Sequence, residues 1–291
     1  MKIDKNTKIL IVGLGLMGGS YAEALTKKCY FVGALDTDKS SICYALEKGL
    51  IKSGKTEIEP DYIGQFDLII FAVYEGVILD WISKNQQYIK KNAIISDVTG
   101  IKSCFIYDLQ KILRSDLEFI GAHPMAGRES SGVENATAEI FKGANYIVTP
   151  TEKNTGSAVE LCRELGKILG FSNISVLSPK RHDEVIGFLS QLTHCIAISL
   201  MTCRDMSGMA DYSGDSFRDL TRIAKINDEM WSEIFLLNKE LLLEQMDLFK
   251  SAFDRLYDLI LKNDRDGIRE IMKKSTLERE LFDKKKGEKQ L

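Results

Sequence analysis

The first 177 residues alternate short runs of apolar side chains with longer segments in which apolar side chains recur every three or four positions. The periodic segments predict helices at 77–90, 102–113 and 157–169, and one more helix after residue 15. The apolar runs predict strands at 9–12, 31–35, 68–72, 93–97, 118–122, 146–149 and 174–177. Strands separated by helices favour a parallel sheet that is covered on both faces.

The pattern changes after Ser178, which suits a helix cap, and Pro179, which suits a first helical turn. From there on only helical periodicity remains, through 185–201 and through 231–261. We therefore expect two domains, at 1–177 and 178–291, and an all-helical second one. Its helices are so apolar that they need a large buried face, which a homodimer interface or burial within one chain would supply.

Composition excludes several classes of protein. The 39 basic residues nearly balance the 42 acidic ones, so no electrostatic case for nucleic acid exists. The six cysteines form no CxxC pair and no cluster with zinc spacing, so we expect reduced thiols and no metal. The N-terminal apolar run is too short for a signal peptide or a membrane span. A cytoplasmic protein without a membrane partner is the expectation.

The most informative motif is Gly13-Leu14-Gly15-Leu16-Met17-Gly18, between the first predicted strand and the first helix. The first glycine permits a tight turn, the second lets the backbone approach a pyrophosphate, and the third lets helix and strand pack closely. The helix N-terminus would bind the pyrophosphate. A glycine-rich turn without a ligand is the alternative. The sequence thus predicts an α/β fold, in which a Rossmann-type doubly wound parallel sheet precedes the helical domain.

Asp36 ends the second predicted strand, where a carboxylate accepts hydrogen bonds from ribose hydroxyls and repels a 2′-phosphate. Asp38 is a nearby rival, and no basic residue precedes Lys39. These features favour NAD over NADP. The residues expected to contact NAD are Gly13, Leu14, Gly15, Leu16, Met17, Gly18, Asp36, Ala72 and Val73.

The chain has three histidines. His123 directly follows a predicted strand, and ligands bind beyond the carboxyl ends of strands in an open parallel sheet, so we expect His123 to meet substrate. His194 lies in an apolar helix, where a satisfied core histidine is the commoner role. His182 lies in a charged first helical turn and is expected at the surface.

Two further segments carry polar candidates. Arg218 and Arg222 are four residues apart and share a helix face. Asp215 and Asp219 offer ion pairs to Arg218, which leaves Arg222 as the favoured clamp for an anion. Thr99 lies between a predicted strand and a predicted helix, where its hydroxyl would contact substrate or nicotinamide, or simply cap the helix.

Taken together, these motifs resemble those of the prephenate/arogenate dehydrogenase family of tyrosine biosynthesis. The matching segments are 13–20, 97–103, 121–132, 190–194 and 217–224. The resemblance implies a nucleotide-binding domain followed by a helical dimerisation domain, and an NAD(P)-dependent oxidative decarboxylation of prephenate to 4-hydroxyphenylpyruvate. It also implies a homodimer through the helical domain.

The resemblance assigns roles to single residues. His123 resembles the base that handles the proton of the substrate's ring hydroxyl, and Arg222 the arginine that binds a substrate carboxylate. His194 resembles a histidine near the substrate side chain, while Thr99 and Glu129 complete the implied substrate-binding set. Arg222 would act in its own subunit or in the partner subunit.

The chain also departs from the family pattern. Many relatives have serine where Gly100 stands, so Thr99 would replace that contact or the contact is absent. The chain has Arg128 and Glu129 where several relatives have Thr or Ser, which leaves prephenate and arogenate open as substrates. A β-hydroxyacid dehydrogenase is a rival of similar architecture, but such enzymes use a lysine that the segment 185–200 lacks.

Overall fold

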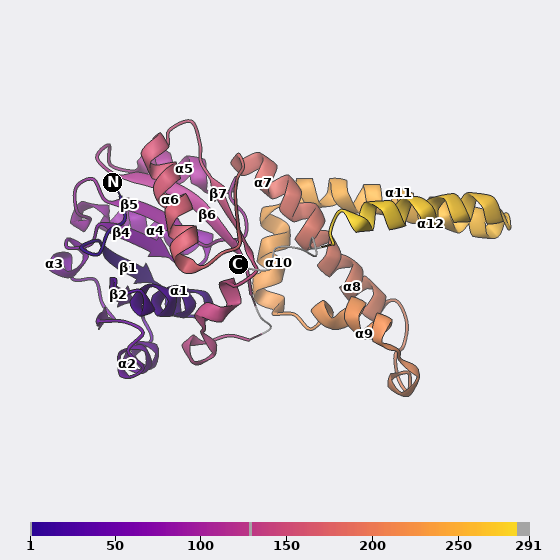
Figure 1. Cartoon of the computed structure of the whole chain (residues 1–291), viewed down its shortest axis with the longest axis horizontal. Coiled ribbons are helices and arrows are strands. Elements are labelled where there is room, and N and C mark those ends of the chain that lie inside the picture. The colour runs from indigo at the N-terminus through magenta and orange to yellow at the C-terminus, as the bar shows by residue number, and fades with distance from the viewer. Residues whose placement is uncertain (1, 128–129, 284–291) are drawn as a thin grey trace, which may run out of the picture. The chain divides into compact units, whose positions relative to one another are not determined.

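The computed structural model describes residues 2–127 and 130–283 (Figure 1). Its internal contacts divide the chain into a first unit, Met1–Lys239, and a second unit, Glu240–Leu291, which are described separately. The boundary predicted from the sequence, at 177/178, stays a prediction.

A single sheet forms the centre of the first unit. Within the described residues its strand order is β3-β2-β1-β4-β5-β6-β7-β8. The strands are β1 (Lys8–Val12), β2 (Phe31–Leu35), β3 (Ser53–Lys55), β4 (Leu68–Phe71), β5 (Ile94–Asp97), β6 (Glu118–Met125), β7 (Asn145–Thr149) and β8 (Asn173–Val176). The chain order reverses between β1 and β4, so this point is the topological switch at which doubly wound sheets bind ligands.

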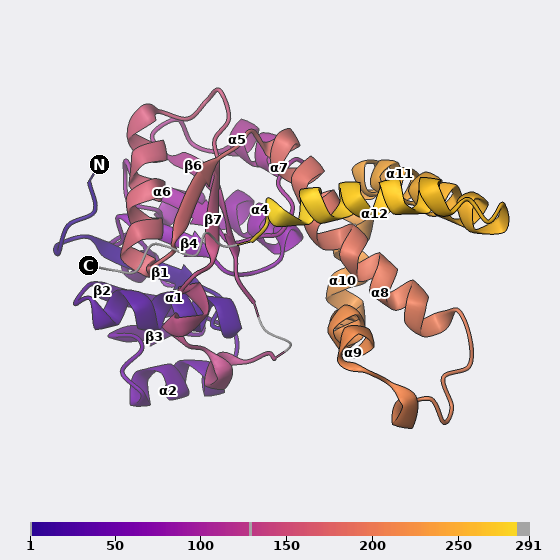
Figure 2. The ribbon, with the colours of Figure 1, turned by 45° about the vertical axis from the view of Figure 1, so that its right-hand side comes forward.

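Helices cover both faces of this sheet, as the sequence predicts (Figure 2). Ile9 and Ile11 of β1 join one apolar cluster with residues of α1 and α6, whereas Leu10 and Val12 join a second cluster with residues of α3, α4 and α5. Neighbouring residues of a strand point to opposite faces, so β1 is buried on both sides. These helices are α1 (Leu16–Lys27), α3 (Pro60–Ile63), α4 (Glu75–Asn85), α5 (Ile106–Ile112) and α6 (Gly156–Leu169).

The sheet and the elements beside it differ in part from the sequence-based expectation. The strand β7 runs antiparallel to β6 rather than parallel. The described part of the connection between them holds only the 3-10 turns Val133–Asn135 and Ala138–Phe141, so no crossover helix returns the chain to a parallel start. The short strand β3 and the helix α2 (Lys39–Glu47) had not been predicted, because neither carries a clear apolar run.

The rest of the first unit is helical, and no strand occurs between residue 178 and residue 283. Ser178 accepts a hydrogen bond from the Arg181 N–H and Pro179 occupies the first turn, which confirms the predicted helix start. The helices are α7 (Pro179–Ile186), a π-helical turn (Gly187–Leu192), α8 (Thr193–Thr202), α9 (Asp215–Thr221) and α10 (Asp228–Leu237).

The helical segment Pro179–Thr202 is long enough to cross a membrane, and an 18-residue window within it is apolar enough, with a mean hydropathy of 1.6. Three polar side chains within it are nevertheless buried inside the protein, namely His182, Asp183 and Gln191. Each makes hydrogen bonds to protein groups. This bonding fits a helix that packs within a folded protein better than one that faces lipid.

The second unit is a pair of antiparallel helices. The helix α11 (Lys239–Leu261) begins at the last residue of the first unit, and α12 (Arg265–Glu280) follows a short turn. Asp264 caps α12 by accepting a hydrogen bond from the Gly267 N–H. Many large apolar side chains of this pair are exposed, among them Leu248, Phe253, Tyr257, Ile260, Met272 and Leu277. An apolar face of this extent needs a partner surface.

Candidate active site

The glycine loop lies at the switch point of the sheet. Val12 of β1 lies opposite Leu35 of β2 on one side and Phe71 of β4 on the other. The next residues along these strands, Gly13, Asp36 and Ala72, therefore share one edge. The Gly13 N–H donates a hydrogen bond to the Leu35 carbonyl at 2.8 Å, which closes the turn against β2.

Two of the three glycines are required by the protein itself. Gly13 has a φ of +95°, and a Cβ there would lie 2.6 Å from the Ala72 carbonyl oxygen. A Cβ on Gly18 would lie 1.9 Å from the Gly13 carbonyl oxygen. A Cβ on Gly15, by contrast, would meet no protein atom within 4 Å. The space beside Gly15 fits the close approach of a dinucleotide pyrophosphate.

The N-terminus of α1 supports this fit. Gly15 occupies the cap position, no side chain caps the helix, and its first turn carries no acidic residue. Leu16 and Met17 are its first two residues. The backbone N–H groups and the positive end of the helix dipole therefore suit an anion.

The two candidate aspartates have different tasks. Asp38 caps α2 by accepting hydrogen bonds from the N–H groups of Ser40 and Ser41, so its carboxylate is committed to that helix. Asp36 accepts from the N–H of Leu14 and from the N–H of Asp38. These contacts fix the Asp36 carboxylate beside the glycine loop, where a ribose would lie.

The remaining cofactor candidates border the same loop. Ala72 directly follows β4 and its N–H donates to the Val12 carbonyl at 2.7 Å. Val73 is half-buried, and its side chain lies within 2.7 Å of the Cβ position of Gly13.

His123 lies within β6 rather than after it, since this strand continues to Met125 and pairs His123 with Ile147 of β7. The side chain is half-buried. Its Nδ1 atom lies 2.8 Å from Nε2 of His182, within hydrogen-bond distance. His123 is therefore held by a second histidine from the helical part of the first unit.

The position of His182 corrects the prediction of a surface residue, because its side chain is fully buried. Its Nδ1 atom lies 2.7 Å from Oδ1 of Asp183. The Asp183 carboxylate also accepts hydrogen bonds from the backbone N–H groups of Lys102 at 2.9 Å and Ser103 at 2.7 Å. The charged neighbours of His182 suggest solvent, but the first turn of α7 packs against the 102–103 turn instead.

A buried ion pair supports the strand that carries His123. Lys102 and Asp97 have side chains with no exposed surface, and the Lys102 ammonium donates to Asp97 Oδ2. The same ammonium donates to the Ala122 carbonyl at 2.6 Å, while Asp97 Oδ1 accepts from the Ala122 N–H at 3.0 Å. The pair thus holds both backbone groups of the residue before His123.

Thr99 belongs to this network. Its buried hydroxyl contacts Asp97, the Ile101 carbonyl and Lys102. The predicted helix at 102–113 begins later, because α5 starts at Ile106 and the N–H groups of residues 102 and 103 bind Asp183. These contacts favour a supporting role for Thr99, and its contact with substrate stays a prediction.

The pKa of His123 is lowered well below its usual value. Burial is the main cause, and the neighbouring His182 and Lys102 add to it. The pKa of His182 is also lowered, mainly by burial, although Asp183 opposes this. Burial raises the pKa of Asp183, but hydrogen bonds from His182 and Ser103 outweigh it and lower the pKa overall. At neutral pH both imidazoles are therefore neutral and Asp183 is ionised.

The other substrate candidates lie in the helical part of the first unit. His194 is half-buried on α8, its Nδ1 atom lies 2.9 Å from the Ser190 carbonyl, and its ring stacks on Trp231 at a centroid distance of 3.7 Å. Arg222 is exposed and begins the 3-10 turn Arg222–Ala224, which packs against α8. Arg218 pairs with Asp215 at 2.6 Å, as expected. Glu129 lies outside the described residues.

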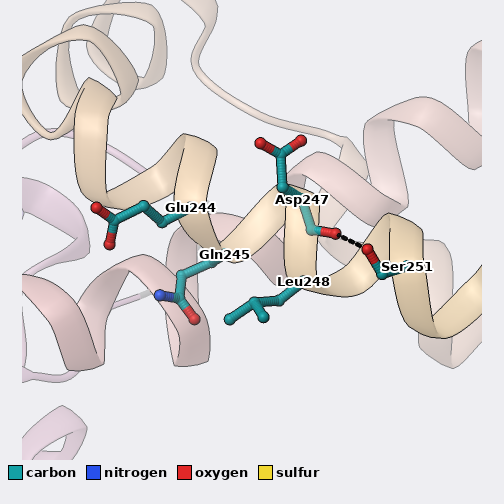
Figure 3. Close-up of a pocket in the computed structure, with 5 residues that line it drawn as sticks. All are labelled: Glu244, Gln245, Asp247, Leu248 and Ser251. Atoms are coloured by element: carbon teal, nitrogen blue, oxygen red, sulfur yellow. Dashed lines mark hydrogen bonds between the residues drawn. The ribbon is translucent and has the colours of Figure 1, made fainter.

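Two hollows in the described part of the chain are candidates for a ligand. One, of about 300 Å³, lies between α8, the Arg222–Ala224 turn and α10, and Trp231 lines it together with Ile198 and Phe235. The other, of about 410 Å³, runs along α11 beside Glu244, Asp247, Leu248 and Ser251 (Figure 3). In the second hollow the Ser251 hydroxyl only donates to the Asp247 carbonyl of its own helix. The first hollow is the better candidate for a ligand, because it shares Trp231 with His194.

A glycine loop at the switch point and a neutral imidazole on β6 of the same sheet are the features expected of a dinucleotide-dependent dehydrogenase. Comparison with known families agrees. Residues 21–172 match the family model described as prephenate dehydrogenase, nucleotide-binding domain, and residues 178–274 match the one described as prephenate dehydrogenase, dimerization domain. The chain belongs to the prephenate dehydrogenase family.

Individual relatives cover nearly all of the chain. A prephenate dehydrogenase of Lactococcus lactis is 31% identical over 96% of this chain and 78% of its own length. A cyclohexadienyl dehydrogenase of Zymomonas mobilis is 29% identical over 92% and 93%. The crystal structure of prephenate dehydrogenase from A. aeolicus in complex with hydroxyphenyl propionate and NAD+ superposes with a TM-score of 0.86, at 30% identity over 95% and 98%.

The glycine loop yields a first prediction. We expect Gly15→Ala to raise the dissociation constant for NADH about tenfold or more, because the methyl group fills the space for the pyrophosphate. Its melting temperature should stay that of the wild type. Fluorescence titration and thermal unfolding measure the two effects. Gly18→Ala is the matched control, and should cost about 1–3 kcal/mol of stability through its collision with Gly13. Unchanged NADH binding in Gly15→Ala would refute this assignment.

The buried ion pair yields a second prediction. Lys102→Met should lower the free energy of unfolding by about 3–5 kcal/mol, because it leaves Asp97 buried without its cation. Lys84→Met is the control, since Lys84 pairs with Asp80 at 2.6 Å on the surface, and should cost less than about 1 kcal/mol. Urea unfolding measures both. Equal losses in the two variants would contradict a supporting role for the buried pair.

Proposed function

We propose that this protein catalyses the NAD-dependent oxidative decarboxylation of prephenate to 4-hydroxyphenylpyruvate. One observation carries the proposal beyond family membership, namely the neutral imidazole of His123 at the end of the sheet that presents the glycine loop. A base for an alcohol proton must be unprotonated at neutral pH, and the lowered pKa of His123 meets this requirement.

The chemistry assigns one proton to His123. When bound, NAD would accept a hydride from the ring carbon that carries the hydroxyl group. His123 takes the hydroxyl proton as that oxygen becomes a carbonyl, and its Nε2 atom does this because Nδ1 is engaged by His182. The ring carboxylate then leaves as carbon dioxide, and its bonding electrons make the ring aromatic. The phenol oxygen regains the proton from His123, so no net proton is released.

The substrate carboxylates require cations or donors from the helical part. Arg222 is proposed as the carboxylate clamp, and His194 as a contact to the substrate side chain. The packing of the Arg222–Ala224 turn against α8 supports this pairing. Glu129 and Thr99 remain further proposed substrate contacts. Whether Arg222 serves its own subunit or the partner subunit is part of the test below.

We further propose a homodimer formed through the helical region. Its support is the match of residues 178–274 to a dimerization domain and the exposed apolar side chains of α11 and α12. A cytoplasmic location, without membrane or nucleic-acid partners, remains part of the proposal.

The proposal is tested by absorbance at 340 nm with prephenate and arogenate, each with NAD and NADP. We expect NADH formation with prephenate and NAD. Turnover of arogenate but not of prephenate would show that arogenate is the substrate, and the absence of turnover with both compounds would refute the proposed function. Mixing Arg222→Gln subunits with His123→Asn subunits tests the origin of the arginine, because a wild-type KM for prephenate returns in the mixture only if Arg222 crosses between subunits.

His123→Asn supplies a third prediction. It should lower kcat by about 100-fold to 10,000-fold, because the developing carbonyl loses its base. The KM for prephenate and the dissociation constant for NADH should change little. Steady-state kinetics and fluorescence titration measure these values. Near-normal turnover would show that His123 is not the base.

Arg222→Gln supplies a fourth prediction, with the opposite kinetic signature. The KM for prephenate should rise by about tenfold to a hundredfold, through loss of a charge-assisted hydrogen bond, while kcat changes less. Arg218→Gln is a matched control four residues earlier, since Arg218 pairs with Asp215. A KM that rises equally in both variants would argue against a specific clamp at Arg222.

A further inference from the structure

We propose that His182 and Asp183 are positioning residues that fix the tautomer of His123 and stabilise the cation formed when His123 takes up a proton. This inference rests on the proposed function of His123 as the base. It assigns roles to two residues that the sequence motifs of the site do not include.

The argument starts from Asp183, whose hydrogen-bond partners are all donors. Oδ1 accepts from the Lys102 N–H at 2.9 Å and Oδ2 accepts from the Ser103 N–H at 2.7 Å. The carboxylate is ionised at neutral pH, so it can only accept. The Nδ1 atom of His182, 2.7 Å from Oδ1, must therefore carry a proton and donate it.

The same reasoning passes through His182 to His123. A neutral imidazole carries one proton, so His182 with a proton on Nδ1 has a bare Nε2 that accepts. That Nε2 atom lies 2.8 Å from Nδ1 of His123, which must then be the donor. A neutral His123 with its proton on Nδ1 presents an unprotonated Nε2. Asp183 thus determines, through His182, which nitrogen of His123 can act as a base.

The chain of hydrogen bonds is held rigidly. The side chains of His182 and Asp183 are 0% and 1% exposed, so water does not compete for their hydrogen bonds. The Asp183 carbonyl accepts from the side-chain amide of Asn238 at 3.0 Å, and Asn238 also donates to Gln191 Oε1 at 2.7 Å. The backbone of α7 is therefore fixed at the Asp183 carbonyl as well.

The charges around the two rings explain the need for Asp183. Besides Asp183, the ionisable groups that act on His182 are Lys102 and Asp97, and Lys102 also acts on His123. The Lys102 ammonium disfavours a second cation nearby, which suits a neutral resting base but opposes proton uptake. When His123 becomes an imidazolium, its Nδ1–H donates to an imidazole that the Asp183 carboxylate polarises. The proton stays on His123 and Asp183 stays ionised.

The resting tautomer can be observed directly by 15N NMR, because the chain has only three histidines. In protein labelled with 15N-histidine at neutral pH, we expect His123 and His182 to carry their protons on Nδ1. The variants His123→Asn and His182→Gln assign the signals. A wild-type His123 with its proton on Nε2 would overturn the proposal without reference to activity.

Substitutions of Asp183 and of His182 should have different effects. Asp183→Asn removes the negative charge that stabilises the imidazolium, and it leaves one amide oxygen for three donors, namely Nδ1–H of His182 and the N–H groups of Lys102 and Ser103. We expect kcat to fall by about 100-fold to 10,000-fold with little change in KM, because the protonated base loses its support. His182→Gln keeps an acceptor for His123 and a donor for Asp183, so it should keep the Nδ1–H tautomer and at least a tenth of kcat.

The pH profile separates this role from a structural one. In His182→Gln one of the two ionisable neighbours that lower the pKa of His123 is lost while Lys102 remains, so the acid limb of kcat/KM should move to higher pH. Asp4→Asn is a matched control, because Asp4 also accepts from two backbone N–H groups, those of Asn6 and Thr7. Its kcat and pH profile should equal those of the wild type.

The outcomes distinguish this inference from the proposed function. Absence of NADH formation by the wild type with either substrate would refute the function, while the NMR measurement would still decide the tautomer. An active wild type with an Asp183→Asn variant that keeps wild-type kcat would refute the inference alone. If Asp183→Asn does not fold, the inference is tested by the 15N NMR spectrum of the wild type and by the acid limb of the kcat/KM profile of the His182→Gln variant.

Discussion

The buried ion pair between Asp97 and Lys102 is the interaction on which the arrangement of the site depends. Removing two charges from water is costly unless every polar atom gains a partner. Here the ammonium contacts Asp97, the Thr99 hydroxyl and the Ala122 carbonyl, which is one acceptor for each of its three protons. The carboxylate in turn accepts from the N–H groups of Thr99 and Ala122. The pair is therefore fully satisfied, and its loss would remove the side-chain contacts to the backbone of Ala122, next to His123.

The same short segment also joins the sheet to the helical part of the first unit. The side chain of Lys102 holds β6, while its backbone N–H and that of Ser103 hold the Asp183 carboxylate at the start of α7. One turn thus fixes both the strand with His123 and the helix with His182. The distance of 2.8 Å between Nδ1 of His123 and Nε2 of His182 follows from these two anchors, because Lys102 and Asp183 are both buried and bonded to backbone groups.

The conformation of the glycine loop could be predicted from the sequence, whereas the support of His123 could not. The roles of Gly13 and Gly18 depend on a turn and a helix within a few residues of each other, so a local motif identifies them. The contact of Lys102 with Asp183 joins residues 81 positions apart, and no periodicity reports it. The charged residues beside His182 predict a solvent-exposed position, because the local sequence does not show this distant contact of Asp183. The sequence contains one indication of this support. Asp97 and Lys102 lie at the end of an apolar strand and just after it, and a charged side chain that is buried there needs a partner of opposite charge.

The site balances two opposing demands on His123. Burial and Lys102 lower its pKa, which keeps the imidazole neutral at pH 7 but also makes it a weaker base. General-base catalysis is most effective when the pKa lies near the working pH, so a large reduction alone would slow proton transfer. At His182, whose pKa burial also lowers, the hydrogen bond with Asp183 opposes the reduction. Lys102 takes part in both effects, because its backbone N–H binds the Asp183 carboxylate while its ammonium group disfavours a cation on His123. The reactivity of the base therefore depends on the geometry of the turn at residues 102–103.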